Sequence, residues 1–590
     1  MDCSTLWHYL KKYLVFAILG ALFMVGEVAM DLAQPSLMSQ VVDDGVLGAN
    51  MQVILSVGLM MLGLAFLGAV CGSANNVFVN IATQNIGNEL RKDCYSRALE
   101  LSFSQIDGIG TGSLITRITN DVRHIEQLVS TFVRGAVRTL FTMFGSVFFL
   151  CALNPHLGLY LLLSMPVAIL VMFAFFAKAT PLFTRLQEQT DQLNAIMQED
   201  LTGIRTVKAC VREIYEKVRF GKANDQLIKT QLKALVLFAF LNPLMNCLMY
   251  LVIALLLLMG NYEVAEGVTT PGVIMASITY ATQMLNAILR VVMLSQDLSR
   301  GLVSWGRLKE ILQSKPQMVQ EASEDYYKGS AEAGGTCAYG VEFRDATFTY
   351  PDASAPVLTG VSFAVDPGQT VAIMGATGCG KSTLINLIPR FYDVTGGSVL
   401  VDGIDVREWD LESLRTAISF AQQRAYLFGK SVRENVVMGD DDPSEERLAR
   451  ALAVAQASDF VAELPEGAQS VVAQRGNSLS GGQQQRIGLA RAVYRCRGVL
   501  VLDDATSALD LKTEADFFAA LDQEFSGITK IIVAQRVATA RRADKIVVLE
   551  NGQVSAQGTH EQLVEGCAAY RDICESQLGS GFATGEVRHG

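Results

Sequence analysis

The stretch Gly375-Ala-Thr-Gly-Cys-Gly-Lys-Ser-Thr383 decides how the second half of this chain folds. It fits the pattern G-x-x-x-x-G-K-[S/T] in full. It directly follows the apolar run Val371–Met374 and opens a helical pattern at Leu384–Ile388. Strand, glycine loop and helix in this order form the context that a phosphate-binding loop requires. The sequence therefore predicts an α/β P-loop NTPase domain built around this loop, rather than a chance glycine-rich turn.

Each residue type in the loop has a predicted task. The glycines leave backbone N–H groups free to wrap around phosphate oxygens, and the following helix adds the favourable end of its dipole. Lys381 is expected to reach the β- and γ-phosphates, and the Ser382 hydroxyl is expected to bind Mg²⁺. The predicted nucleotide-binding residues of the loop are Gly375, Ala376, Thr377, Gly378, Cys379, Gly380, Lys381, Ser382 and Thr383.

The composition points to a membrane protein. Half of the 590 residues are hydrophobic and the mean hydropathy is +0.29, which is high for a soluble protein. The net charge of −11 argues against a nucleic-acid partner, which would require a basic face. The eleven cysteines are scattered singly, without metal-ligand spacing, so we expect free thiols. The N-terminal apolar run lacks a small-residue cleavage site, so no cleavable signal peptide is expected.

Six apolar runs fill the first half of the chain, each near the ~20 residues that a bilayer-crossing helix needs. They are Tyr13–Met38, Val53–Val79, Val137–Cys151, Leu157–Phe176, Leu235–Met259 and Val273–Leu294. The predicted fold class is therefore an α-helical membrane domain with six spans, followed by the P-loop domain.

The distribution of basic residues predicts how the spans are oriented. The connections 39–52, 152–156 and 260–272 contain no Lys or Arg, whereas the long segments 80–136 and 177–234 contain many. By the positive-inside rule, both termini and both long segments are cytoplasmic. We expect a multi-pass protein of the plasma or inner membrane, in a bacterium.

Two stretches within the long segments have the pattern of helix, turn and helix. They are Asp107–Asp121 and Glu199–Phe220. Each could dock onto a cytoplasmic domain, or it could simply be the solvated end of two helices.

Polar residues inside the spans are candidates for function because they are costly in lipid. Three pairs lie on shared helix faces: Glu27 with Asp31, Asn242 with Asn246, and Gln283 with Asn286. For the amides we favour hydrogen bonds between helices. For Glu27 and Asp31 a substrate path and a structural role are equally supported, and an acidic path would favour cationic substrates.

A change in composition marks the boundary between the two halves. Small and acidic residues follow Pro316 and continue through Thr336. The predicted divisions are a membrane domain at 1–310, a linker at 311–340, a nucleotide-binding domain at 341–577 and a tail at 578–590.

Four further features are predicted partners of the phosphate loop. A buried strand, Val499–Leu502, ends in Asp503, which is the expected second Mg²⁺ contact. Gln423 offers an amide that could reach the metal or its water. Tyr350 could stack on adenine, or it could be a core aromatic at the end of a strand.

The fourth feature is Leu479-Ser-Gly-Gly-Gln483, directly before an amphipathic helix. Its glycines and serine at a helix N-terminus are suited to holding phosphate. The predicted phosphate-binding residues here are Ser480, Gly481, Gly482 and Gln483.

These features in this order resemble the ATP-binding cassette (ABC) family. The order is Tyr350, GATGCGKST, Gln423, LSGGQ, LVLDDATSALD and IIVAQR, and the resemblance extends to Gly558-Thr-His-Glu561. Six spans ahead of one cassette resemble exporter-type half-transporters. TGSLITRITND and LTGIRTVKA also resemble the coupling loops of that family.

The resemblance implies a dimer that binds ATP and Mg²⁺. Two cassettes would meet head to tail, so that Ser480–Gln483 of one chain would contact the ATP held by the other. ATP binding would close the cassettes and turn the spans outward, and hydrolysis would reset the cycle. The implied function is ATP-driven export of hydrophobic or amphipathic compounds such as drugs, lipids or peptides.

The sequence departs from the family pattern at three positions. Asp504 stands where the family usually has a glutamate that polarises water, and Gln535 stands where it has a switch histidine. Gln474 stands where it often has a glutamate. The first two changes remove two catalytic groups from one pocket and resemble the degenerate-site subunit of heterodimeric exporters.

We therefore expect a second half-transporter chain as partner, with hydrolysis mainly in the partner's pocket. In this chain's own pocket, Asp504, Gln535 and Gln423 are the candidate catalytic residues, and Ser382, Gln423 and Asp503 are the candidate metal ligands. Two alternatives stay open: a homodimeric exporter or flippase with Asp504 as a working base, and a nucleotide-gated channel or sensor.

Overall fold

The computed structural model describes residues 4–316, 318, 338–351, 353–473 and 476–578. It divides into two compact units. One contains residues 1–99 and 112–314, and the other contains residues 100–111 and 315–590. Most of the predicted linker, nearly all of the predicted tail, and Gln474 lie outside the described residues.

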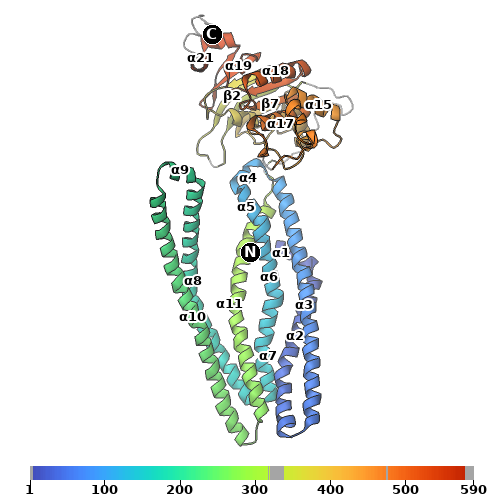
Figure 1. Ribbon diagram of the computed structural model, residues 1–590, viewed down its shortest axis with the longest axis vertical. Helices are drawn as coiled ribbons and strands as arrows, with labels where there is room; N and C mark the ends of the chain where they lie inside the picture. Colours follow the sequence, from blue (N-terminus) through green and yellow to red (C-terminus); the bar gives the residue numbers. More distant parts are fainter. Residues whose placement is uncertain (1–3, 317, 319–337, 352, 474–475, 579–590) are drawn as a thin grey trace. The chain divides into compact units, whose positions relative to one another are not determined.

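The first unit is helical throughout (Figure 1). Its α-helices are α1 Ser4–Lys12, α2 Leu14–Gln40, α3 Met51–Glu100, α5 Thr111–Thr116, α6 Val122–Ser130, α7 Val137–Leu153, α8 Pro155–Thr202, α9 Ile204–Ala209, α10 Glu213–Ala265 and α11 Pro271–Gln313. Three π-helical turns continue them: η1 Val41–Leu47, η2 Arg117–Asp121 and η3 Thr131–Ala136. The described residues contain six helical segments of 34 to 53 residues that are apolar enough to cross a membrane, which confirms the six predicted spans.

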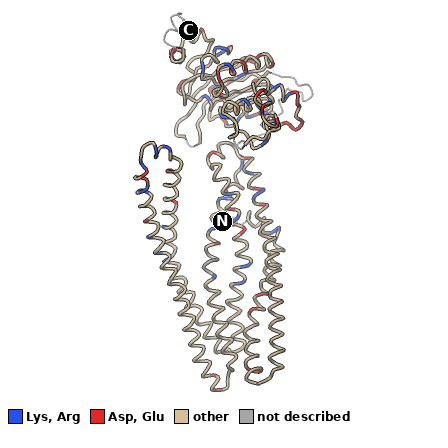
Figure 2. Tube along the Cα trace, viewed as in Figure 1, with Lys and Arg blue, Asp and Glu red and all other residues tan. Residues whose placement is uncertain are grey.

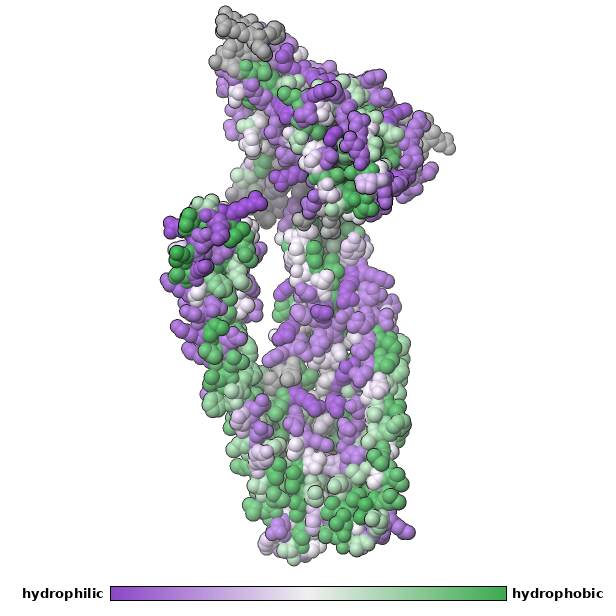
Figure 3. Space-filling model, viewed as in Figure 1, coloured by the Kyte–Doolittle hydropathy of each residue, from purple (hydrophilic) through white to green (hydrophobic). Residues whose placement is uncertain are grey.

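These helices are longer than a bilayer requires. A helix rises 1.5 Å per residue, so 53 residues extend to about 80 Å against an apolar core of about 30 Å. Figure 2 shows charged residues gathered around α9 and sparse along most of α8 and α10. Figure 3 shows hydrophobic side chains over the other end of the same helices. The spans therefore continue into polar extensions, as the sequence predicted.

The acidic pair in the first span has a basic partner that the sequence analysis did not identify. Arg138, at the start of α7, donates to Glu27 Oε1 at 3.0 Å and to Asp31 Oδ2 at 3.3 Å. One guanidinium thus joins two carboxylates that lie one turn apart on α2. These contacts show that the pair has a role between helices and that its charge is partly balanced.

The predicted hydrogen bonds of the span amides are not observed among the described residues. Asn242 and Asn246 on α10 are exposed. Gln283 Oε1 on α11 is buried and has no hydrogen-bond partner within the described part of the chain.

The second unit contains two sheets and short helices. A four-stranded sheet has the order β2-β1-β4-β5, and a six-stranded sheet has the order β10-β9-β3-β8-β7-β6. The strands are β1 Val341–Phe348, β2 Leu358–Val365, β3 Thr370–Met374, β4 Gly396–Val401, β5 Ile404–Asp405, β6 Ile418–Ala421, β7 Val499–Asp503, β8 Thr529–Val533, β9 Lys545–Glu550 and β10 Gln553–Gly558. The helices are α12 Lys381–Asn386, α13 Leu411–Ala417, α14 Val432–Val436, α15 Glu445–Val454, α16 Ser458–Ala462, α17 Gly481–Tyr494, α18 Leu511–Glu524, α19 Val537–Ala540, α20 His560–Gly566 and α21 Ala568–Leu578.

The order of the parallel strands determines which residues meet. β3 lies between β8 and β9, and β7 lies beside β8. The carboxyl ends of these buried strands therefore share one edge of the sheet. The phosphate loop follows β3, Asp503 ends β7 and Gln535 follows β8, so three motifs that are far apart in sequence converge at that edge.

The short helix α4 (Phe103–Ile109) belongs with the second unit, although the predicted boundaries place it in the first. Ser102 and Gln105 form a capping box that begins the helix, and Gly110, with φ of 80°, ends it. The Phe103 ring packs against Phe391 at 4.8 Å, and the Tyr392 hydroxyl donates to Asp107 Oδ2 at 2.7 Å. These contacts join residues 107–111, the beginning of the predicted docking stretch, to the cassette unit, and the role of the stretch as a coupling loop stays a prediction.

The second predicted docking tip is formed by α9 and the turns that flank it. Val211 and Ile214 are each 80% exposed there. An apolar tip of this kind suits a contact with another surface, and its docking stays a prediction.

Breaking the Arg138 bridge should destabilise the helical unit. Arg138→Met leaves two carboxylates near each other without a cation. We expect it to lower the free energy of unfolding by about 1.5–3 kcal/mol, the range for hydrogen bonds to charged groups. The measurement is the melting temperature, taken as the temperature at which detergent-solubilised protein stops being monodisperse.

The matched control is Lys178→Met, which removes an exposed cation on α8. Adding Glu27→Gln to Arg138→Met should restore part of the lost stability, because it removes one of the uncompensated charges. Equal melting temperatures for wild-type protein and Arg138→Met would contradict the prediction.

Candidate functional site

The phosphate loop adopts a backbone that its glycines make possible. Gly375 has φ of 153°, and a Cβ there would lie 2.2 Å from the Leu549 carbonyl oxygen. Gly380 has φ of 101°, and its Cβ would lie 2.8 Å from Leu358 Cδ2. A side chain at either position would clash or strain the loop, so the motif glycines are required by the local geometry.

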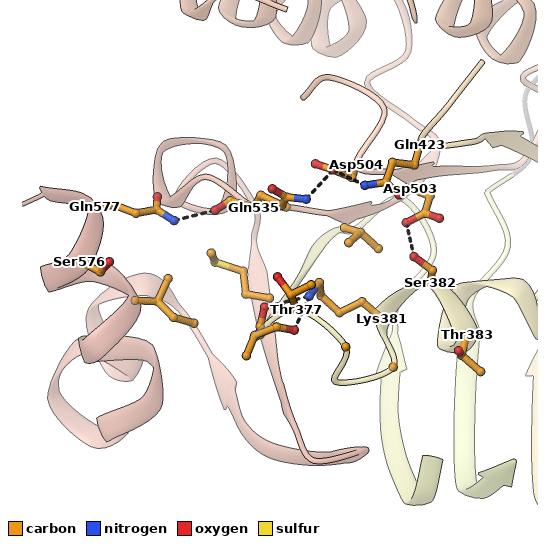
Figure 4. Close-up of a pocket in the computed structure, with 18 of the residues that line it drawn as sticks. Thr377, Lys381, Ser382, Thr383, Gln423, Asp503, Asp504, Gln535, Ser576 and Gln577 are labelled. Atoms are coloured by element: carbon orange, nitrogen blue, oxygen red, sulfur yellow. Dashed lines mark hydrogen bonds between the residues drawn. The ribbon is translucent and has the colours of Figure 1, made fainter. Parts of the chain in front are cut away.

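A cavity of about 680 Å³ lies over this loop (Figure 4). It is lined by loop residues 375–383 apart from Cys379, and by Gln423, Asp503, Asp504 and Gln535. Within it, the Lys381 ammonium donates to the carbonyl oxygens of Gly375 at 2.9 Å and Ala376 at 2.8 Å. The structure thus brings the predicted lysine, serine, glutamines and aspartates together around one space.

The predicted metal ligands lie next to each other. The Ser382 hydroxyl donates to Asp503 Oδ1 at 2.9 Å, and Asp503 is 8% exposed at the end of β7. A hydroxyl and a carboxylate are hard oxygen ligands of the kind that Mg²⁺ prefers in phosphate-binding sites. The residues present therefore fit a magnesium ion, which would neutralise phosphate charge when bound.

Three predicted binding features lie outside this cavity. Cys379 is buried in the core cluster beneath the loop. Tyr350 lies beside the loop, with its hydroxyl 3.2 Å from Thr383 Oγ1 and its ring 5.4 Å from that of Tyr392.

Residues Ser480–Gln483 are the third feature. They form the first turn of α17, where Ser480 and Gln483 make a reciprocal capping box. Gly481 is exposed to solvent, and none of the four residues lines the described cavity. The LSGGQ stretch therefore does not contribute to the cavity over this chain's own phosphate loop.

Burial shifts the pKa of both adjacent aspartates in the same direction. It raises the pKa of Asp503, against the opposing effect of the Ser382 hydroxyl, and it raises the pKa of Asp504, against the effect of Gln423. Asp504 is 7% exposed and has φ of 48°, in the left-handed region that non-glycine residues seldom adopt. Its carboxylate is therefore held by an unusual backbone in a position that partly excludes water.

Two amides converge on a single oxygen of Asp504. Gln423 Nε2 donates to Asp504 Oδ2 at 3.0 Å, and Gln535 Nε2 donates to the same oxygen at 2.6 Å. Both hydrogen bonds are drawn in Figure 4. Two of the three residues at which the sequence departs from the family pattern, Asp504 and Gln535, are thus in direct contact.

Several residues that support the site were missed by sequence reasoning. Gln485 on α17 donates to the Gln423 carbonyl at 3.2 Å and accepts from the Ala508 amide at 2.8 Å, which holds two loops of the site together. The C-terminal helix α21 also lines the cavity, through residues that include Ser576 and Gln577. Gln485 and the residues of α21 lie outside the recognised motifs, and their contribution depends on where the chain returns in space.

Two regions of the chain match known families. Residues 17–288 match the ABC transporter transmembrane region, and residues 358–507 match the ABC transporter family. The chain belongs to the ABC transporter family. It is an exporter-type half-transporter, in which a membrane domain and one cassette form a single chain, and ATP hydrolysis in such proteins is coupled to transport.

Full-length relatives support this assignment. The chain is 35% identical to the ABC transporter ATP-binding protein YfiB of Bacillus subtilis over 97% of this chain and 98% of that protein. It is 32% identical to an ATP-dependent lipid A-core flippase of Syntrophus aciditrophicus over 92% of this chain and 89% of that protein. It is also similar to the structure of a bacterial Atm1-family ABC exporter with ATP bound, with a TM-score of 0.78 and 26% identity over 96% of this chain and 99% of that chain.

Replacing Asp503 should stabilise the nucleotide-free protein while weakening its response to Mg²⁺ and ATP. Because burial raises the pKa of Asp503, its ionised form is less favourable in the folded than in the unfolded chain. That penalty is present above the raised pKa and disappears as pH falls through it. Asp503→Asn should therefore raise the melting temperature at neutral pH, and this gain should shrink in acid.

The same variant should lose the Mg²⁺-dependent part of the stabilisation that ATP gives, measured by thermal unfolding with and without a chelator. A gain in melting temperature that is independent of pH, or unchanged stabilisation by Mg²⁺, would contradict the prediction.

Proposed function

We propose that this exporter works as one half of a heterodimer, in which its own pocket binds ATP and hydrolyses it slowly. The observation that carries the proposal is the contact of Gln423 and Gln535 with one oxygen of Asp504. The residues predicted to hold nucleotide and metal are present. In the position of the catalytic base, however, an aspartate replaces glutamate, and this aspartate is hydrogen-bonded to two glutamines.

The geometry explains why Asp504 would be a weak base. A general base must lie within about 2.6–3.2 Å of the proton that it accepts, and aspartate is one methylene shorter than glutamate. A misplacement of about 1 Å can cost on the order of 10²-fold in rate. In addition, the amides of Gln423 and Gln535 both donate to Asp504 Oδ2, so an oxygen that would accept the proton already has two donors.

Gln535 contributes to the same effect. A neutral amide can donate to a phosphate oxygen, but it does not titrate near pH 7 as imidazole does. In this pocket its Nε2 is directed to Asp504 instead. We infer that ATP here serves mainly to hold two cassettes together.

The LSGGQ stretch supports a productive partner pocket. Its serine, glycines and glutamine are intact, and none of them lines the cavity over this chain's own phosphate loop. In a head-to-tail dimer, Ser480–Gln483 would complete a pocket on the partner chain. This arrangement favours a transporter over a channel or sensor, in which binding without turnover would suffice.

We infer an amphipathic substrate, of the lipid, drug or peptide kind. An almost wholly apolar groove of about 460 Å³ lies between α2 and α7, where Phe141, Phe144 and Phe148 contribute to its walls. A charged residue lies close to this apolar groove: Arg138 on α7 precedes Leu140, the first groove residue of that helix, by two positions. The flippase relative, whose name specifies a lipid A-core, is in keeping with a substrate of this type.

We also propose a route by which the nucleotide influences the helical unit. Tyr350 contacts Thr383 of the phosphate loop, its ring packs edge-on against Tyr392, and Tyr392 donates to Asp107 on α4. Burial, reinforced by Asp107, raises the pKa of Tyr392, so its hydroxyl stays a donor. The relay therefore connects the predicted adenine-stacking residue to the tip of a membrane helix pair.

Restoring glutamate in this chain should leave the turnover of the heterodimer intact or raise it. Asp504→Glu extends the carboxylate towards the water position, so slow hydrolysis here should become faster. Replacing the matching glutamate of the partner with glutamine should nearly abolish turnover. Steady-state ATPase assays of the reconstituted pair measure both effects.

Two outcomes favour the alternatives. Equal loss from altering either pocket would exclude an asymmetric pair. Brisk turnover by this chain alone, lost on Asp504→Asn, would show a homodimer with Asp504 as a working base.

Removing the Tyr392 hydroxyl should uncouple hydrolysis from transport. Tyr392→Phe keeps the ring beside Tyr350 but loses the hydrogen bond to Asp107, and Asp107→Asn keeps an acceptor of the same size. We expect Tyr392→Phe to lower transport several-fold while basal ATPase activity changes less. Vesicle transport and ATPase measurements on the same preparation test this, and equal losses in both would contradict it.

A further inference from the structure

The C-terminal helix α21 lies against the nucleotide cavity. One side of the helix joins the core of the cassette, where Tyr570 and Cys574 are buried. Asp572, Ile573, Ser576 and Gln577 of the same helix line the cavity of the phosphate loop, and Figure 4 labels the last two. The helix therefore brings side chains to the pocket from a part of the chain that contains no nucleotide-binding motif.

Gln577 hydrogen-bonds to the backbone of the two residues that flank Arg536. Residues 535–537 are called the switch segment. Its Nε2 donates to the carbonyl oxygen of Gln535 at 2.7 Å, and its Oε1 accepts from the amide of Val537 at 2.9 Å. One side-chain amide thus pairs with two backbone groups spaced two residues apart, as a neighbouring strand would. This pairing fixes the backbone from which the Gln535 side chain projects.

The Gln535 side chain continues the connection into the site. Its Nε2 donates to Asp504 Oδ2 at 2.6 Å. The intervening residue, Arg536, is held separately, by an ion pair with Glu514 and a hydrogen bond to the Leu509 carbonyl at 3.2 Å. Because Arg536 is anchored elsewhere, Gln577 is the contact from α21 that acts directly on the backbone of Gln535.

We propose that Gln577 is a positioning residue for ATP hydrolysis, which sets the orientation of Gln535 over Asp504. Its effect reaches the reacting atoms through the backbone of residue 535. It therefore does not depend on whether glutamine or histidine stands there, or on which pocket of a dimer turns over. In this arrangement α21 contributes to the catalytic geometry of the cassette.

The test uses the full-length chain reconstituted in lipid, both as it stands and with Asp504→Glu and Gln535→His to raise its turnover. Gln577→Ala removes both backbone hydrogen bonds. Gln577→Glu has the same length and keeps only the bond from Val537. Glu575→Gln, two residues away on the same helix, is the matched control.

We expect Gln577→Ala to lower kcat by about five- to tenfold, the loss that one or two hydrogen bonds would cause, with KM for ATP changed by less than about twofold. Gln577→Glu should fall between alanine and wild type. In a Gln535→Ala background, Gln577→Ala should have no further effect on kcat. The proposal would be overturned if Gln577→Ala lowered kcat equally in the Gln535→Ala background, or if the fall in kcat came with a matching fall in melting temperature. Either result would show that Gln577 only attaches α21 to the cassette.

A second measurement applies even where turnover is too slow to follow. Amide hydrogen exchange of the switch segment should rise at Val537 by at least about tenfold in Gln577→Ala, because that amide loses its acceptor, and should be unchanged in Glu575→Gln. Unchanged exchange at Val537 would also overturn the proposal. Brisk turnover by the unmodified chain would contradict the heterodimer instead, and it would leave the outcome for Gln577 readable.

Discussion

The pairing of β3 between β8 and β9, with β7 beside β8, is the constraint on which the nucleotide site depends. Parallel strands that are buried on both faces present their carboxyl ends at one edge, where loops replace the regular hydrogen-bond ladder. The phosphate loop, Asp503 and Gln535 each follow or end one of these strands. The catalytic geometry is therefore a consequence of strand order, and a change of register would separate residues that act together.

The contact between Asp504 and Gln535 gives a physical meaning to two departures from the family pattern. Considered separately, each is a conservative exchange of one polar side chain for another. In the structure, the shorter carboxylate and the amide form a hydrogen bond with each other, and Gln423 joins the same oxygen. A glutamate and a histidine would meet at the same place with different reach and different proton chemistry. The two substitutions therefore form a compatible pair that preserves a closed, hydrogen-bonded pocket.

The boundaries of the structural units differ from the boundaries of the sequence. The helix α4 interrupts the membrane segments in sequence, yet it packs with the cassette through Phe103 and Asp107. The helix α21, which ends at Leu578, returns to the pocket that the phosphate loop begins. Both elements bring to the cassette side chains that lie outside its nucleotide-binding motifs.

Much of this protein could be predicted from its sequence because the relevant forces act over short distances along the chain. Span-length hydrophobic runs predict membrane helices, and the glycines of residues 375–380 are required by local backbone geometry, so the fold class and the phosphate loop were identified correctly. The two altered positions, Asp504 and Gln535, were also recognised from the motifs around them.

The tertiary structure alone decided which side chains become partners. Arg138 lies 111 positions from Glu27, Gln577 lies 42 positions from Gln535, and Tyr392 lies 285 positions from Asp107. Contacts at such separations depend on how helices and sheets pack, and no periodicity or local motif encodes them. The sequence by itself therefore determined that this protein spans a membrane and holds nucleotide. Packing decided what restrains Asp504, what balances the charges in the first span, and how α21 meets the site.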